Sequence, residues 1–291
     1  MKIRAATRGS ALARWQADYV ASLLSEASGL ETEPVIVSTQ GDRDKSTPLH
    51  ELGGKGVFVK EVQVAVLDGR ADIAVHSAKD LPAVTPDDLV IAAVPVRADA
   101  RDALVGSTLA DLATGARVGT GSVRRQVQLA EQRPDIELVE IRGNIDTRLG
   151  LISAHGGELD AIVMAAAALD RLERSEAVVE RLDPTTMLPQ VGQGALAVEC
   201  RADNDELVAA LRAIDDPDSH RVLTAERAFL HELGGDCDLP AGAYATLDGD
   251  ELSIAALLAD DSGRIVRDRA VGTEGVELGR RLAIDLRARL H

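Results

Sequence analysis

An apolar segment runs directly into a Lys-Asp pair in D-I-A-V-H-S-A-K-D, residues 72–80. The apolar part is typical of a β-strand, so Lys79 and Asp80 would lie where that strand ends. In open α/β sheets, ligands bind in the crevice at the carboxyl ends of strands, and the two side chains are therefore placed to take part in chemistry. A buried ion pair with a purely structural role is the alternative.

Four further segments combine glycine or arginine with a neighbouring apolar run. They are G-G-K-G at 53–56, G-T-G-S-V-R-R at 119–125, R-G-N-I-D-T-R at 142–148 and V-G-Q-G-A at 191–195. Only five of the 32 cationic residues are lysines, which leaves 27 arginines, many of them in these segments. Guanidinium groups bind carboxylates and phosphates through paired hydrogen bonds, so the clustering predicts an anionic small-molecule ligand. Codon bias towards arginine is the alternative for the total count.

The 291 residues carry a formal net charge of -16 and are 45% hydrophobic. A chain of this size can bury a sizeable core and is expected to form two or three domains. Nucleic acids and anionic membranes bind basic surfaces, so neither is expected as the main partner. The start, M-K-I-R-A-A-T-R, lacks the apolar segment of a signal peptide, and no run is long enough to span a membrane. We therefore expect a cytoplasmic protein.

Neither the cysteines nor the histidines are spaced as metal ligands. Cys200 and Cys237 are too few for a disulfide framework and lack the paired spacing of a zinc site. The six histidines show no H-E-x-x-H or comparable spacing. The sequence therefore predicts that no metal is bound.

Two parts of the chain share one local plan, a short strand followed by a helix with serine near its start. In the first, Ser10 can cap a helix, which places Arg8, Gly9 and Ser10 at the helix N-terminus. The plan returns at 117–132, where Gly121 and Ser122 precede the helix. Helix N-termini favour anions, and strands that alternate with helices indicate parallel sheets. The repeat predicts two similar α/β halves.

The six motifs together make the chain resemble the porphobilinogen deaminase family over nearly its whole length. They occur in the family's order: A-T-R-G-S at 6–10, G-G-K-G-V-F-V-K-E at 53–61, D-I-A-V-H-S-A-K-D-L-P at 72–82, G-T-G-S-V-R-R-Q at 119–126, R-G-N-I-D-T-R-L at 142–149, and V-G-Q-G-A with E-C-R at 191–201. The resemblance implies a transferase that deaminates four porphobilinogen molecules and joins them head to tail into hydroxymethylbilane. It also implies a dipyrromethane cofactor, attached through a thioether to Cys237.

The expected fold is α/β, with two periplasmic-binding-protein-like lobes, a cleft between them and a small C-terminal α+β domain. We expect residues 1–95 and 196–216 in the first lobe, 96–195 in the second, and 217–291 in the C-terminal domain that carries Cys237. Segments 94–102 and 191–201 are expected to cross between the lobes as strands. The C-terminal domain is expected to contain a helix through Leu223–Leu233, strands near 241–247, 251–258 and 263–271, and a helix at 275–290.

The resemblance also implies roles for individual residues. Asp80 would be the catalytic acid that stabilises the cation left by loss of ammonia and moves protons. The cofactor-binding set would comprise Cys237, Lys79, Asp80, Thr120, Ser122, Arg124, Arg125, Gly143 and Arg148. The substrate-binding set would comprise Arg8, Ser10, Lys55, Phe58, Arg142 and Gln193, with Arg97 and Arg101 less securely placed.

Three features depart from the family's pattern. Asp236 and Asp238 flank Cys237, and two carboxylates disfavour the thiolate. Gly121 stands where many members carry serine, and Glu51 where some carry lysine. The glycines at 53–56 suggest a lid or a simple surface turn. We expect a monomer that binds porphobilinogen; a non-catalytic two-lobed protein that binds or senses a small anion is the alternative.

Overall fold

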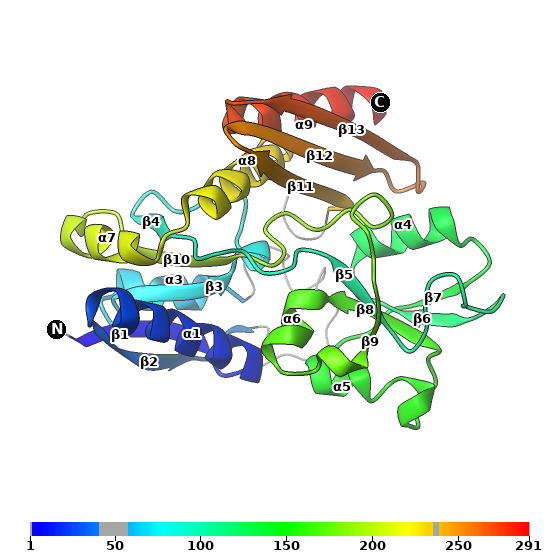
Figure 1. Cartoon of the computed structure of the whole chain (residues 1–291), viewed down its shortest axis with the longest axis horizontal. Helices are drawn as coiled ribbons and strands as arrows, with labels where there is room; N and C mark the ends of the chain where they lie inside the picture. Colours follow the sequence, from blue (N-terminus) through cyan, green and yellow to red (C-terminus); the bar gives the residue numbers. More distant parts are fainter. Residues whose placement is uncertain (1, 41–57, 235–238, 291) are drawn as a thin grey trace.

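The computed structural model describes residues 2–40, 58–234 and 239–290. Two α/β lobes lie side by side, at the left and right of Figure 1, and a third unit covers them from above. Lys55 and Cys237, with the glycine segment 53–56, lie outside the described residues. No helix in the described ranges combines the length and the apolar character needed to cross a membrane.

The first lobe is built on a mixed five-stranded sheet with the order β2-β1-β3-β10-β4. Its strands are β1 (Lys2–Arg8), β2 (Glu31–Val37), β3 (Ile73–Ser77), β4 (Leu89–Ala93) and β10 (Leu196–Arg201). β1 runs parallel to β2 and β3, whereas β10 runs antiparallel to β3 and β4. Its main helices are α1 (Ala11–Ser28), α3 (Lys60–Leu67) and α7 (Asp205–Leu211).

The second lobe repeats this plan in the order β7-β6-β8-β5-β9. Its strands are β5 (Asp102–Val105), β6 (Arg117–Gly119), β7 (Glu137–Val139), β8 (Ala161–Ala165) and β9 (Val178–Arg181). Here β5 is the strand that runs antiparallel to its neighbours β8 and β9. Its helices are α4 (Val123–Gln132), α5 (Ile145–Leu149) and α6 (Ala166–Arg171). The expected two similar halves are confirmed.

The C-terminal domain packs two helices against a three-stranded antiparallel sheet, as expected. Its elements are α8 (Pro217–Leu233), β11 (Ala241–Asp248), β12 (Glu251–Ala259), β13 (Ile265–Gly272) and α9 (Gly275–Leu290). Helix α9 lies close against α8 because Gly279 has no side chain: a Cβ there would lie 2.3 Å from the carbonyl oxygen of Ala225. Phe229 of α8 is completely buried in this core.

Two extended segments connect the lobes, but neither is a regular strand where it crosses. Residues 94–101 lead to β5, and residues 182–195 lead to β10. They touch where the amide of Ala98 donates to the carbonyl oxygen of Gly194 at 3.2 Å. A Cβ at Gly194 would lie 2.5 Å from the carbonyl oxygen of Ala98, and its φ is +87°, so glycine permits this approach. The expected strand character is therefore wrong for residues 94–101 and 191–195, whereas it is confirmed for 196–201, which form β10.

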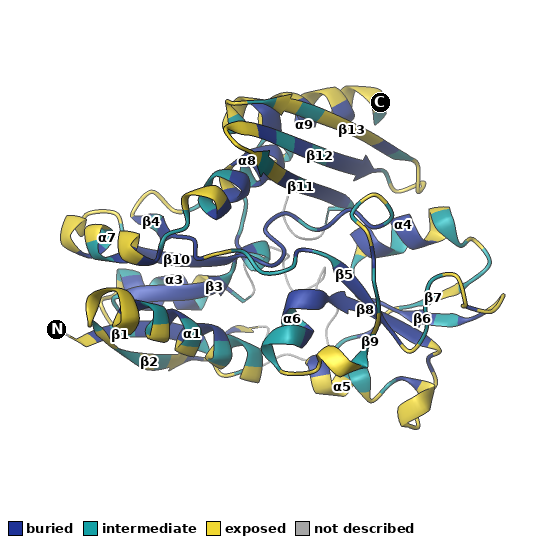
Figure 2. Ribbon diagram, in the orientation of Figure 1, coloured by how far each residue is buried: buried dark blue, intermediate teal, exposed yellow. Residues whose placement is uncertain are grey.

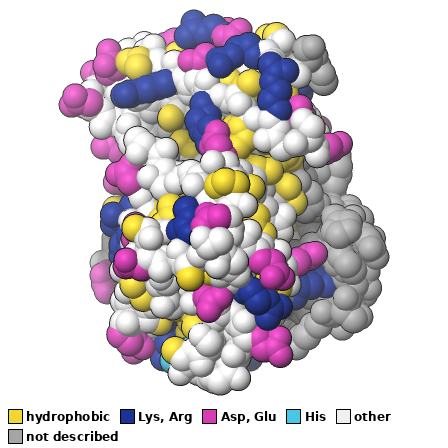
Figure 3. Space-filling view, turned by 90° about the vertical axis from the view of Figure 1, so that its right-hand side faces the viewer, with side chains coloured by type: hydrophobic (Ala, Val, Ile, Leu, Met, Phe, Trp, Pro, Cys, Tyr) yellow, Lys and Arg dark blue, Asp and Glu magenta, His cyan; other side chains and the backbone are white. Residues whose placement is uncertain are grey.

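The most buried residues lie on the central strands of the sheets. In Figure 2 the central strands are largely buried, whereas the outer faces of α7, α5 and α9 are exposed. Each lobe has its own apolar core, which fixes the strand ends at which functional side chains lie. On the face formed by the second lobe and the C-terminal domain, charged side chains of both signs are interspersed, as Figure 3 shows.

Candidate active site at the carboxyl ends of the strands

Most of the expected site residues follow the carboxyl end of a parallel strand. Arg8 ends β1, Lys79 and Asp80 follow β3, and Thr120 and Ser122 follow β6. Arg142 and Gly143 follow β7 in the same way. Loops at this edge of a sheet are not needed for pairing, so they can present side chains to a ligand.

A small pocket of about 50 Å³ opens at this edge of the first lobe. Its lining includes Arg8, Ser10, Phe58 and Asp80, which the structure therefore brings together. The Arg8 guanidinium lies over the Phe58 ring, 4.1 Å from its centre. The Ser10 hydroxyl oxygen caps α1 by accepting a hydrogen bond from the amide of Ala13 at 3.3 Å, as the sequence predicted.

Lys79 lies half-buried beside Asp80 in a short 3₁₀ turn, Ala78–Asp80. Burial lowers the pKa of its ammonium group to about 8, although the negative charge of Asp80 opposes the shift. Among the charged groups of the second lobe, Arg125 and Arg124 lower the pKa and Asp102 raises it. The pKa of Lys79 therefore depends on charges of both lobes.

In the second lobe, Thr120 and Ser122 lie in the turn from β6 into α4. Thr120 is fully buried, and its hydroxyl oxygen accepts a hydrogen bond from the amide of Ser122 at 3.3 Å. Ser122 precedes the first residue of α4. A Cβ on Gly121 would lie 2.6 Å from the carbonyl oxygen of Ile141. Glycine in place of the serine that many family members carry therefore permits a close approach of the two backbone segments.

Arg124 and Arg125 project from the first turn of α4 and are almost fully buried. Both form ion pairs of 2.8 Å with Asp102, the first residue of β5. Arg125 also donates from Nη1 to the carbonyl oxygen of Val163 at 3.0 Å. The expected anion-binding arginines thus share a buried counter-ion that the sequence did not single out.

Arg148 adds a further cation beside this cluster. Burial lowers the pKa of its guanidinium to about 10, and the charges of Arg125 and Arg142 contribute to the shift. Its Nε donates to the carbonyl oxygen of Gly143 at 2.9 Å. Gly143 has a φ of +108°, and a Cβ there would lie 2.8 Å from Cγ2 of Thr147, so glycine is required.

The other expected residues have structural partners. Gln193 is completely buried, and its Nε2 donates to the carbonyl oxygen of Ala100 at 2.7 Å. Arg97 forms a buried ion pair of 2.6 Å with Glu226 of α8, and Arg101 pairs with Asp99 at 2.8 Å.

Comparison with known proteins agrees with this architecture. A family model described as "Porphobilinogen deaminase, dipyromethane cofactor binding domain" matches residues 3–209, and one described as "Porphobilinogen deaminase, C-terminal domain" matches residues 221–288. The chain belongs to the porphobilinogen deaminase family. The porphobilinogen deaminase of Acidothermus cellulolyticus is 49% identical, over 98% of this chain and 88% of that protein. That of Roseiflexus sp. strain RS-1 is 47% identical, over 96% and 94% respectively.

Among solved structures, a periplasmic substrate-binding protein of an ABC transporter from Coxiella burnetii matches with a TM-score of 0.43. It is 13% identical, and the match covers 77% of this chain and 96% of that one.

Membership of the porphobilinogen deaminase family confirms three expectations. The chain is a transferase of tetrapyrrole biosynthesis, its substrate is porphobilinogen, and its cofactor is dipyrromethane. The alternative of a non-catalytic anion-binding protein is set aside. Four substrate molecules are deaminated and joined head to tail into hydroxymethylbilane.

The side chains of the second lobe fit a cofactor that carries carboxylates. Arg124 is only 2% exposed, yet its Nε and Nη2 have no hydrogen-bond partner among the described residues. An unpaired buried donor is costly, and a carboxylate is the acceptor that a guanidinium fork binds best. The deaminase cofactor supplies such groups, so the orphaned donors suit dipyrromethane.

Three polar residues near the site, Gln16, His76 and Glu199, were not predicted from the sequence. Gln16 lines the pocket, and its Nε2 donates to Oγ of Ser77 at 2.8 Å. His76 also lines the pocket, and its Nε2 lies 2.9 Å from Oε2 of the fully buried Glu199. The helical spacing of Gln16 from Ser10 could have indicated that Gln16 lies near the pocket. The pair of His76 and Glu199 could not be predicted in this way, because these residues are far apart in the chain.

Proposed function

We propose that the deaminase builds its oligopyrrole in the cleft between the lobes, with Asp80 on one side and the arginines of α4 and α5 on the other. The observation that supports this most directly is that segment 182–195 contacts both sides. Its Gln190 donates to the carbonyl oxygen of Lys79 at 3.1 Å, and its Gln193 donates at 3.0 Å to Asp102, the counter-ion of Arg124 and Arg125. The charges of the two arginines also lower the pKa of Lys79, in agreement with this arrangement.

Asp80 has two tasks in this proposal. Loss of ammonia from the aminomethyl group of porphobilinogen leaves a cation, which a nearby carboxylate stabilises. The coupling step then releases a proton from a pyrrole carbon, and the same carboxylate can accept it. Asp80 suits both tasks because it lines a pocket that also contains a cation, Arg8, and a hydroxyl group, Ser10.

The arginines would bind the carboxylates of the growing chain. Each porphobilinogen unit brings an acetate and a propionate, so two negative charges are added at every step. Arg124 and Arg125 lie on α4, Arg148 lies on α5, and Arg142 lies on the loop between β7 and α5. The charges of Arg125 and Arg142 both lower the pKa of Arg148, as expected of neighbouring cations. The dipyrromethane, when bound, supplies the pyrrole carbon to which the first substrate is joined.

The remaining expectations complete the proposal. Cys237 would carry the cofactor, and Lys55, Phe58 and Gln193 would complete the substrate site with Ser10. Thr120, Ser122 and Gly143 would hydrogen-bond to the cofactor. The domain boundaries proposed from the sequence are supported by the membership of the three sheets. We further propose a cytoplasmic monomer that binds neither nucleic acid nor membrane and needs no metal.

The pKa of Lys79 provides a test of this site. Lys79 could bind a carboxylate of the substrate or of the cofactor. If it binds a substrate carboxylate, the KM for porphobilinogen should rise as pH increases through about 8, because the positive charge is lost there. The rise should reach about tenfold by pH 9, equivalent to about 1.4 kcal/mol. Lys79→Met should have a high KM at pH 7 and little further change, as measured by initial rates of ammonia release.

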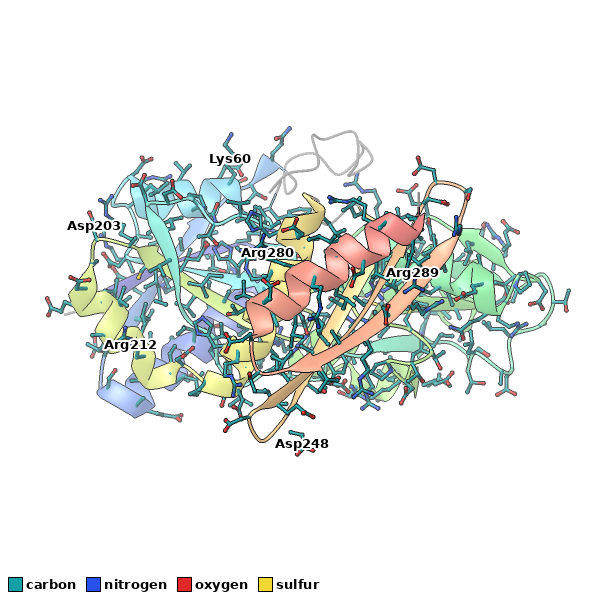
Figure 4. The ribbon with its side chains drawn as sticks, turned by 90° about the horizontal axis from the view of Figure 1, so that it is seen from above. Lys60, Asp203, Arg212, Asp248, Arg280 and Arg289 are labelled. Atoms are coloured by element: carbon teal, nitrogen blue, oxygen red, sulfur yellow. The ribbon has the colours of Figure 1, made fainter. Side chains whose placement is uncertain are left out.

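Lys60→Met is the matched control. Lys60 is exposed at the start of α3, at the outer margin of the first lobe in Figure 4. This variant should keep the pH dependence of the parent protein. A parent KM that stays constant between pH 7 and 9 would argue against binding by Lys79.

A further inference from the structure

Asp102 occupies the first position of β5, where the outgoing crossing segment enters the second lobe, and it is completely buried. Its Oδ2 lies 2.8 Å from Nη1 of Arg124, and its Oδ1 lies 2.8 Å from Nη2 of Arg125. Nε of Arg125 also donates to Oδ1 at 2.9 Å. One carboxylate therefore holds two neighbouring guanidinium groups.

The charges of these three side chains do not balance. Burial alone would raise the pKa of Asp102, but Arg124 and Arg125 lower it to about 2, so the carboxylate is ionised at neutral pH. Like charges repel strongly where water is excluded. Asp102 therefore allows the two guanidinium groups to lie side by side, and one positive charge is left without a counter-charge among the three.

The position of Asp102 also determines which hydrogen-bond donors of Arg124 remain available to a ligand. Nη1 of Arg124 forms the ion pair with Asp102 and donates a hydrogen bond to the carbonyl oxygen of Leu188 at 2.5 Å. Nε and Nη2 of Arg124, like Oδ2 of Asp102, have no hydrogen-bond partner within the described residues. Gln193 of the returning crossing segment holds the carboxylate by donating to Oδ1 at 3.0 Å. The same amide donates to Ala100, so both crossing segments fix the position of Asp102.

We propose that Asp102 is a positioning residue of the deaminase, which orients the Arg124–Arg125 pair and leaves it ready for one further carboxylate. The cofactor would supply that carboxylate, and the pair would then have two negative charges for its two positive ones. This inference rests on the proposed function, because it takes the ligand to be a pyrrole carboxylate. Asp102 itself has no contact with the reacting atoms and acts through the arginines.

Asp102→Asn tests the proposal in the full-length protein. Apoprotein is made in a host that forms no porphobilinogen, holoprotein is made by incubating it with porphobilinogen, and melting temperatures of both are measured. Asparagine keeps the shape but leaves two buried cations unbalanced until a carboxylate binds. The apoprotein should therefore lose more stability than the holoprotein, and the difference between their melting temperatures should widen by about 5 °C. Equal losses in both forms would overturn the proposal.

Two further variants sharpen the result. Asp99→Asn removes a nearby carboxylate that pairs with Arg101 and Arg181, and it should leave the difference between holoprotein and apoprotein unchanged. Asp102→Glu keeps the charge but moves it by one methylene group. It should restore the stability of the apoprotein and still lower turnover at least about tenfold, since orientation matters within about 1 Å. Normal turnover of Asp102→Glu would contradict a positioning role, even if Asp102→Asn fails to fold.

The intact mass of the protein distinguishes failure of the proposed function from failure of the role proposed for Asp102. If the parent apoprotein gains no adduct from porphobilinogen, the proposed function fails. If it gains the adduct normally but the variants show no widened difference and no loss of turnover, only the role of Asp102 fails.

Discussion

Asp80→Asn should lower the rate of hydroxymethylbilane formation by about 10²- to 10⁴-fold, the usual contribution of a positioned acid or base. The amide keeps the size and the position after β3, so the fold and the cofactor content should not change. It has no negative charge to stabilise the cation and does not accept the proton. Single-turnover ammonia release and product formation would measure the loss separately at each step.

Asp203→Asn is a suitable control for that change. Asp203 is exposed on the first lobe and pairs with Arg201 at 2.7 Å, and Figure 4 places it at the periphery of the molecule. Turnover of this variant should equal that of the parent protein. Near-normal product formation by Asp80→Asn would show that another group moves the proton.

Arg124→Leu should lower the stability and should also prevent normal cofactor assembly. The change removes the ion pair with Asp102 and the hydrogen bond to the carbonyl oxygen of Leu188, and a hydrogen bond to a charged group typically contributes about 1.5 to 3 kcal/mol. We expect a loss in that range and not the larger cost of an unpaired buried charge, because Arg125 still pairs with Asp102. Denaturant unfolding would measure the stability, and intact mass would report the fraction that carries cofactor.

Arg267→Leu provides the comparison, because it also breaks an Arg–carboxylate pair. Arg267 of β13 pairs with Glu131 of α4, but both side chains are substantially exposed, at 39% and 43%. Exposed pairs contribute at most about 1 kcal/mol, so this variant should remain close to the parent protein and assemble its cofactor. Equal losses for Arg124→Leu and Arg267→Leu would contradict the special position of Arg124.

Local rules predicted much of the fold. Ser10 caps α1 because an N-cap depends only on the residues next to it, and β11, β12 and β13 lie close to where the alternation and the turn residues placed them. The sequence after R-G-N predicts a helix from about Asn144 to Ala154, which is longer than the helix in the structure. Helix α5 ends at Leu149, before Gly150, and a short 3₁₀ turn follows at Ser153–His155. Periodicity alone did not locate this break.

The candidate site was predictable only in part, because its buried contacts join distant segments. Motif positions identified Arg124 and Arg125, yet their counter-ion Asp102 precedes them by more than twenty residues. Glu226 is another example, since it binds Arg97 together with the amides of Gly192 and Ala245. No local pattern marks these carboxylates as buried, because their burial follows from how the domains pack together.

The central claim is that the cofactor is attached to Cys237, and mass spectrometry tests this claim most directly. Cys200 is an unsuitable nucleophile, because burial, followed by the charge of Glu199, raises the pKa of its thiol to about 11. The intact mass of the purified holoprotein, followed by peptide mapping, should exceed the sequence mass by two deaminated porphobilinogen units. The excess should map to tryptic peptide 228–264, which contains Cys237, and Cys237→Ser should lack it while Cys200→Ser retains it. A holoprotein with the bare sequence mass, or an adduct on Cys200, would contradict the account.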